Sequence, residues 1–111
     1  MMEETDSLVQ IMTTVDSLKK AEVLARWLVE ERYAACSQVL GPIKSTYWWE
    51  GRVERAEEWL IIFKTLNSLV EKATLEIERR HPYKTPEIIL SGPHEASEGY
   101  LKWIKQVLGS E

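Results

Sequence analysis

Apolar and polar positions divide this chain into strand-like runs and segments with helical spacing. The first run, LVQIMTT at residues 8–14, is rich in residue types that favour a strand. Asp16 and Ser17 follow it, and both types are common helix N-caps. From residue 18 to 33 apolar side chains recur every three or four positions, with charged residues largely between them. The beginning of the chain therefore predicts a strand followed by an amphipathic helix.

Two long strand patterns come next, at residues 35–49 and 52–65, and only Glu50 and Gly51 separate them. A two-residue link that contains glycine predicts a tight hairpin. Each arm of about 14 residues would span roughly 45 Å at about 3.3 Å per residue. A compact chain of this size has a radius of gyration of only about 13 Å. The hairpin must therefore bend, with the Gly41-Pro42 break as the candidate position, or project beyond the body.

A second amphipathic helix is predicted after the hairpin, with Thr65 or Asn67 as its cap. It should end near His81, because a residue that precedes proline is disfavoured in the helical region. Its apolar residues keep helical spacing and are Leu66, Leu69, Val70, Ala73 and Ile77.

The stretch EIIL at residues 87–90 then predicts a buried strand that starts after Pro86 and is closed by Ser-Gly-Pro. A last helix follows, with Gly109 as its C-cap. Its apolar face consists of Tyr100, Trp103, Ile104, Val107 and Leu108.

This order, β-α-β-β-α-β with an added C-terminal helix, predicts an α+β fold of the ferredoxin-like sandwich type. At 111 residues the whole chain, 1–111, fits a single domain. The long hairpin between the second and third strands is the feature that sets it apart from a minimal sandwich.

Composition narrows the functional classes. Apolar content is 44% and charged content 29%, as in ordinary soluble globular proteins. No apolar run approaches the roughly 20 residues of a membrane span, and the acidic start MMEETDSL lacks the features of a secretory signal. We therefore expect a cytoplasmic protein without a membrane partner. The net charge of −4, with acids and bases interleaved, also argues against nucleic acid as a partner.

The tip of the predicted hairpin carries three aromatic residues, Tyr47, Trp48 and Trp49. Strand alternation sends Trp48 to one face and the other two to the opposite face. A projecting hairpin would expose these rings on both faces, and exposed aromatic patches usually mark an interface. The alternative is that the hairpin folds back and the rings complete the chain's own core. We favour the interface, and closed symmetric assembly is its simplest form.

Strand directions separate the residues that could carry chemistry. Cys36 opens the second strand and Lys64 ends the third, so we expect them near each other at one end of the subunit. His81, Tyr83 and Glu87 should lie at the other end. Cys36 and His81 could therefore share a site only across two subunits.

Each of these residues has a functional and a structural interpretation. A thiolate at Cys36 would suit copper or another thiophilic ion, or Cys36 could be a small buried apolar residue. His81 could bind a metal or titrate near neutral pH, or it could complement the dipole at a helix C-terminus. Lys64 could hold an anion or extend its stem from the strand end, and Glu87 could supply a hard oxygen ligand or lie solvated. The sequence has no nucleophile elbow, phosphate loop, dinucleotide pattern or HExxH pair, so we do not expect an enzyme.

Five stretches, taken together, carry a family resemblance: YAACSQV, STYWWEGRVE, FKT, HPYKTPEII and YLKW. In this order and spacing they resemble the CutA divalent-cation-tolerance family over essentially the whole chain. The resemblance implies a homotrimer of ferredoxin-like subunits, similar in architecture to the PII nitrogen-signalling proteins, with copper binding and no established catalysis. The positions that match residues marked in the family are Cys36, Trp48, Trp49, Lys64, His81, Pro82, Tyr83, Pro86 and Glu87. Ser37-Gln38 departs from the family pattern, in which asparagine stands where this chain has Gln38.

The resemblance implies a trimeric protein that responds to metal ions and binds copper or another divalent ion at intersubunit clefts. Cys36 of one chain would meet His81 or Glu87 of a neighbour as metal ligands. Lys64, Tyr83 and Trp48 would line the cleft, and Tyr47, Trp48 and Trp49 would form the interface. The alternative is a PII-like signalling trimer that binds a small anionic metabolite through Lys64, Arg52 and Arg55, or a partner protein. A purely structural assembly module would bind no ligand.

Overall fold

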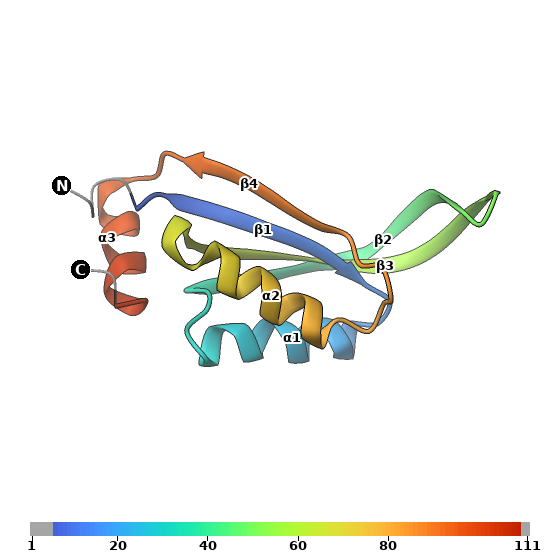
Figure 1. The fold of residues 1–111 in the computed structure, drawn as a ribbon, viewed down its shortest axis with the longest axis horizontal. Coiled ribbons are helices and arrows are strands. Elements are labelled where there is room, and N and C mark those ends of the chain that lie inside the picture. The colour runs from blue at the N-terminus through green and yellow to red at the C-terminus, as the bar shows by residue number, and fades with distance from the viewer. Residues whose placement is uncertain (1–5, 110–111) are drawn as a thin grey trace.

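The computed structural model describes residues 6–109 and shows one antiparallel sheet with two helices on one face and a third helix at its end (Figure 1). The sheet order is β2-β3-β1-β4. This is the predicted ferredoxin-like arrangement with an added C-terminal helix. Its elements are β1 (Leu8–Val15), α1 (Leu18–Glu30), β2 (Cys36–Trp49), β3 (Arg52–Leu66), the 3-10 turn η2 (Asn67–Leu69), α2 (Val70–Arg80), β4 (Ile88–His94) and α3 (Glu98–Val107).

The core lies between the sheet and the pair α1 and α2. Phe63 and Ile11 from the sheet meet Leu28 of α1 and Ile77 of α2, and all four side chains are fully buried. A second, smaller cluster forms where α3 packs against the end of the sheet, around Ile104. Burial of these apolar faces, at roughly 25 cal/mol per Å², is the main force that fixes the layers.

Helix ends follow the sequence only in part. The Ser17 hydroxyl caps α1 by accepting a hydrogen bond from the Lys20 backbone N–H, and α2 stops at Arg80 with His81 in an extended conformation, as predicted. The predicted caps of α2 are wrong. The Thr65 side chain instead bonds to the carbonyl of Tyr33, and the second helix begins with η2.

The η2 turn is held by residues from the beginning of the chain. The Asn67 backbone N–H donates to the carbonyl of Ser7. The Asp6 carboxylate accepts from both the backbone N–H and the hydroxyl of Ser68. The cap therefore comes from about sixty residues away in sequence, so local capping rules could not reveal it.

The prediction of a buried last strand is wrong. β4 is the edge strand that pairs only with β1, and Ile89 and Leu90 are 48% and 51% exposed. It also runs through the Ser-Gly-Pro sequence and ends at His94. An apolar run indicates that a strand can be buried on both faces, but only the neighbours decide whether it is.

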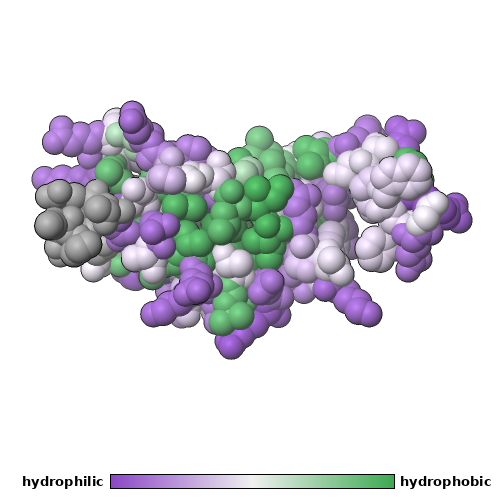
Figure 2. Space-filling model, turned by 45° about the horizontal axis from the view of Figure 1, so that its top comes forward, coloured by the Kyte–Doolittle hydropathy of each residue, from purple (hydrophilic) through white to green (hydrophobic). Residues whose placement is uncertain are grey.

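The face of the sheet opposite α1 and α2 is uncovered over its centre. Because Ile11, Ile61 and Ile88 point into the core, alternation turns the residues next to them outward. Figure 2 shows a hydrophobic patch on this face. We call it the open sheet face, and its residues in neighbouring register are Met12, Leu40, Leu60, Ile62 and Ile89.

The hairpin of β2 and β3 extends well beyond the body, as predicted (Figure 1). The molecule measures 50 × 24 × 23 Å along its principal axes. Trp49 pairs with Arg52 at the tip, but between Leu40 and Ile43 the register shifts. Gly41 and Pro42 there stand opposite the single residue Trp59, which is a β-bulge at the predicted break.

Candidate functional site

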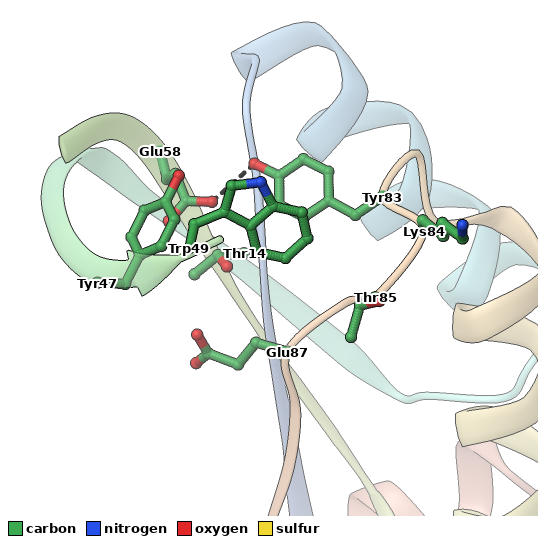
Figure 3. Close-up of a pocket in the computed structure, with 8 residues that line it drawn as sticks. All are labelled: Thr14, Tyr47, Trp49, Glu58, Tyr83, Lys84, Thr85 and Glu87. Carbon is green, nitrogen blue, oxygen red and sulfur yellow. Dashed lines mark hydrogen bonds between the residues drawn. The ribbon is translucent and has the colours of Figure 1, made fainter. Parts of the chain in front are cut away.

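A cleft opens where the hairpin leaves the body, on the same side as the open sheet face (Figure 3). We call it the hairpin cleft, and its volume is ≈ 370 Å³. Strands β1, β2 and β3 and the loop between α2 and β4 all contribute to it. Its lining residues are Thr14, Tyr47, Trp49, Glu58, Tyr83, Lys84, Thr85 and Glu87.

The firmest contact in the hairpin cleft joins Tyr83 to Glu58. The Tyr83 hydroxyl donates to Glu58 Oε2 at 2.7 Å, and Glu58 is only 6% exposed. Burial raises the pKa of the Tyr83 phenol well above its usual range, and the Glu58 carboxylate adds to the shift. Tyr83 is therefore a permanent hydrogen-bond donor at physiological pH rather than a base.

Glu87 brings a second carboxylate to the cleft, and its side chain is exposed. Figure 3 shows the Glu87 carboxylate on the same side of the cleft as Glu58 and Tyr47, while the Lys84 amine points away from both acids. The rings of Tyr47, Trp49 and Tyr83 form the apolar part of the wall. The cleft thus offers oxygen donors and aromatic faces, both of which suit a cation.

His81 lies directly behind the cleft and is almost completely buried. Its Nδ1 accepts a hydrogen bond from the Tyr83 backbone N–H at 3.1 Å. Its Nε2 lies 2.9 Å from Thr13 Oγ1, and that hydroxyl uses its own hydrogen on the Glu87 carbonyl at 2.6 Å. Nε2 must therefore carry the hydrogen and donate it to Thr13.

This arrangement fixes His81 as a neutral ring with both nitrogens engaged. Burial lowers the pKa of His81, which agrees with the neutral form. The ring edge also packs against Tyr83, with centroids 4.9 Å apart. In this structure His81 holds the 81–87 loop onto β1, and a metal at His81 would have to displace one of these bonds.

Cys36 and Lys64 lie opposite each other on β2 and β3, toward α3, as the strand directions predict. The Lys64 amine is 5.8 Å from the centre of the Tyr100 ring. Burial raises the pKa of the Tyr100 hydroxyl, and the Cys36 thiol contributes to the shift. Cys36, Lys64 and Tyr100 thus form one cluster, apart from the cleft.

Within one chain, the predicted metal ligands Cys36, His81 and Glu87 are not brought together. No cluster of three or more His, Cys, Asp or Glu side chains suited to a metal occurs in the described part of the chain. A shared site across subunits stays a prediction. The cations of the alternative anion site do not converge either, because Arg52 stands at the hairpin tip with Glu54 while Lys64 lies near the far end of β3.

The predicted aromatic residues divide as alternation requires. Tyr47 and Trp49 line the hairpin cleft, whereas Trp48 points to the other side and is 74% exposed. Trp48 is thus not part of this cleft within one chain, and its place in an intersubunit cleft or interface stays a prediction.

Sequence reasoning missed Glu58, Thr14, Lys84 and Thr85. Glu58 lies in the charged run ERAEE, where nothing in the residue types distinguishes it from its exposed neighbours. Glu58 differs from them only because Tyr83, in the α2–β4 loop, donates a hydrogen bond to its carboxylate. Lys84 and Thr85 flank Tyr83 and Pro86, which were singled out, so proximity in sequence was their available signal. For Thr14 the signal was its place at the end of the first strand, whose direction puts it beside His81 and Tyr83.

Fold and cleft together define a small ferredoxin-like α+β protein with an extended hairpin. The family model described as "CutA1 divalent ion tolerance protein" matches residues 9–107. The chain therefore belongs to the CutA divalent-ion tolerance family, which confirms the resemblance seen in the sequence. The family description names tolerance to an ion and no reaction.

Individual relatives agree. "Protein CutA, chloroplastic" of Arabidopsis thaliana is 36% identical over 107 residues, 94% of this chain, and this chain spans 59% of that relative's length. "Divalent-cation tolerance protein CutA" of Thermus thermophilus is 34% identical over 99 residues, 89% of this chain and 96% of the relative. The solved structure of the periplasmic divalent cation tolerance protein CutA from Archaeoglobus fulgidus has a TM-score of 0.87 and 35% identity, and covers 91% of this chain and 98% of that one.

Helices α1, α2 and α3 are all too short or too polar to cross a membrane, and the same holds throughout residues 6–109.

Proposed function

We propose that this protein is a homotrimer that binds a divalent metal ion, copper or another, at clefts between its subunits and serves the response to metal ions. Membership of a family named for tolerance to divalent ions supports this function. The observation on which it rests most is the hairpin cleft, where the two carboxylates Glu58 and Glu87 share one opening, while residues 6–109 of one chain bring no three metal ligands together.

Assembly is supported by surfaces that one chain leaves uncovered. The open sheet face is apolar, β4 is an unpaired edge, and the hairpin exposes Trp48 beyond the body. Apolar faces and strand edges of this kind are normally covered in solution. A closed ring of three chains would cover all of them with one type of contact.

The residues fit different metals. The carboxylates of Glu87 and Glu58 suit hard divalent ions, and a Cys36 thiolate from a neighbouring chain would favour copper. His81 contributes a ligand only if its ring gives up the bond from Tyr83 N–H. Its established contacts support a positioning role for the loop that carries Glu87.

Isothermal titration of the purified protein with Cu(II), Cu(I) under reducing conditions, and Zn(II) tests the proposal. We expect binding that Glu87→Gln, Cys36→Ser or His81→Ala weakens, while the control Glu95→Gln, in the loop before α3, leaves it unchanged. Binding equal in all variants, or none at all, would remove the metal site. Light scattering on the same samples tests the trimer independently.

We also propose a cytoplasmic location, which the ordinary soluble composition of the chain supports. Two relatives bear names that specify the chloroplast and the periplasm, so family membership does not decide the compartment. Fractionation of the source cells with an antibody to the protein is the direct test. Recovery with a periplasmic or organelle marker would overturn the assignment.

A further inference from the structure

A second groove lies in the helix layer, away from the open sheet face. The helices α1 and α2 run antiparallel (Figure 1), so the start of α1 lies beside the end of α2. We call the space between these two ends the helix groove. The residues of its lining that carry charge or an exposed apolar surface are Lys19, Lys20, Val23, Trp27, Arg79 and Arg80.

The helix groove is positively charged in a chain that is negative overall. Four of its lining residues are cations and none is an acid. The Glu76 carboxylate is 3.0 Å from Arg79 and 3.6 Å from Arg80, so one acid serves two guanidinium groups. Asp16 pairs with Lys20 at 3.3 Å. Four cations against two carboxylates leave a local balance of +2, whereas the whole chain carries −4.

The helix dipole explains only two of the four cations that line the helix groove. Arg79 and Arg80 occupy the last turn of α2, where cations complement the helix dipole. Lys19 and Lys20 occupy the first turn of α1, which contains no acid, and there the dipole disfavours cations. Lys19 forms no ion pair within residues 6–109. Asp16 offsets the charge of Lys20, so Lys19 breaks the local rule without compensation, which indicates a functional reason for this residue.

The floor of the helix groove is apolar. Val23 is 63% exposed, an unusual position for a branched apolar side chain. The Arg80 guanidinium stacks on the Trp27 ring with 3.3 Å between its central carbon and the ring centre, and Trp27 in turn stacks on Tyr33. The stack orders Arg80 before any ligand arrives, which lowers the entropic cost of binding through it.

We propose that the helix groove binds an acidic peptide segment of a partner protein, one that carries an apolar or aromatic side chain flanked by carboxylates. The carboxylates would meet Lys19, Lys20 and Arg79, and the apolar side chain would cover Val23 and Trp27. The positive charge of the groove favours an acidic ligand. A long nucleic acid or an anionic membrane would also face the acidic remainder of the chain, which repels an extended polyanion.

Fluorescence anisotropy with the full chain tests the proposal. The probe is a fluorescein-labelled peptide, Gly-Glu-Asp-Phe-Asp-Glu-Gly, and the comparison peptides replace Phe by Gly or replace every acid by Lys. We expect saturable binding of the acidic peptide, weaker binding without Phe, and none of the basic peptide. Binding should weaken as salt rises from about 20 to 200 mM, because exposed charges are then screened.

Two matched double variants distinguish the loss of cations in the helix groove from a change in the net charge of the protein. Lys19→Glu with Lys20→Glu should weaken peptide binding roughly tenfold or more, the equivalent of two lost ion pairs. Lys72→Glu with Lys102→Glu makes the same charge change on exposed positions of α2 and α3 and should leave binding within about twofold of the wild type. Val23→Ser should weaken the Phe-containing peptide selectively.

Stability measurements keep the test independent of folding and of metal binding. Acids in the first turn of α1 favour the helix, which offsets the loss of the exposed Asp16–Lys20 pair, so the Lys19→Glu, Lys20→Glu variant should melt close to the wild type and keep its oligomeric state. Equal loss in both double variants, binding of the basic peptide, or full displacement of the acidic peptide by equimolar inorganic phosphate or single-stranded DNA would overturn the proposal.

Discussion

The Tyr83 hydroxyl donates a 2.7 Å hydrogen bond to the Glu58 carboxylate, and this bond ties the α2–β4 loop to the base of the hairpin. Tyr83 and Glu58 are 25 residues apart in sequence. The loop also presents Glu87, so its position decides how the two carboxylates of the hairpin cleft face each other.

We predict that Tyr83→Phe lowers the free energy of unfolding by about 1–3 kcal/mol, because the almost buried Glu58 loses its donor. Urea unfolding followed by circular dichroism measures the change. Tyr47→Phe is the matched control, since it removes a hydroxyl from the same cleft that makes no hydrogen bond within residues 6–109. Equal effects of the two variants would show that the bond to Glu58 adds nothing to stability.

Alkaline titration should distinguish Tyr83 from ordinary tyrosines. Its pKa is raised in the folded state, so the phenol stays protonated while the unfolded chain ionises near pH 10. The stability that this bond contributes is therefore present below about pH 10 and is lost as pH rises beyond it. We expect the wild type to lose stability above pH 10 more steeply than Tyr83→Phe. Parallel pH profiles of the two proteins would contradict this.

Acidification should act through His81. Its pKa is lowered in the folded state, so the unfolded chain binds the proton first. The contribution of His81 is complete above its ordinary pKa of about 6.5 and declines as pH falls below that value. We expect His81→Gln to show less loss of stability between about pH 7.5 and 5 than the wild type. His94→Gln is the control, and nitrogen NMR should show the hydrogen of His81 on Nε2.

Gly41 tests the packing of the bulge. A Cβ atom there would come within 2.6 Å of Trp59 Cδ1 and 3.1 Å of the Glu58 carbonyl oxygen. We predict that Gly41→Ala costs about 1–3 kcal/mol of stability through this overlap. Gly99→Ala, in α3 with no atom within 4 Å of the new Cβ, should instead stabilise by about 0.5–1 kcal/mol. A neutral Gly41→Ala would mean that Trp59 moves aside freely.

Assembly should depend on the open sheet face. Ile89 on that face and Leu75 on α2 are exposed to nearly the same extent, 48% and 47%. We predict that Ile89→Glu prevents the proposed trimer from forming, because it would place a charge where another chain packs in that assembly, whereas Leu75→Glu should not. Light scattering after size-exclusion chromatography reads the mass directly. A trimer that survives Ile89→Glu would show that another surface holds it together.

Periodicity alone predicted the order and type of the elements, because strand and helix faces leave distinct spacings in the sequence. Periodicity failed for features that depend on which elements of the fold pack together. The apolar residues Ile89 and Leu90 indicated burial, yet whether a strand is central or at an edge depends on topology that its own residues do not encode. Asp6 caps the turn before α2 across the fold, which no local signal reveals.

The candidate site was predictable only in part. Strand directions correctly placed Tyr83 and Glu87 at one end and Cys36 with Lys64 at the other. Glu58 was missed because its role arises from a contact with a distant loop. The hydrogen bonds of His81 are also beyond sequence reasoning, since they depend on the Thr13 hydroxyl donating its hydrogen to the Glu87 carbonyl.

The bulge at Gly41 and Pro42 inserts one extra residue into β2 and shifts the alternation of its side chains. Before it, Cys36, Gln38 and Leu40 share the open side of β2, and after it Ile43, Tyr47 and Trp49 do, so the side that carries even-numbered residues has passed to odd-numbered ones. With one residue fewer at this point the bulge would disappear, but Tyr47 would still pair with Glu54 and Trp49 with Arg52, so both rings would stay on the side of the hairpin cleft. Because a bulge bends its strand and increases the local twist, a single-residue deletion there would change the angle at which the hairpin leaves the body while the aromatic lining of the cleft kept its residues.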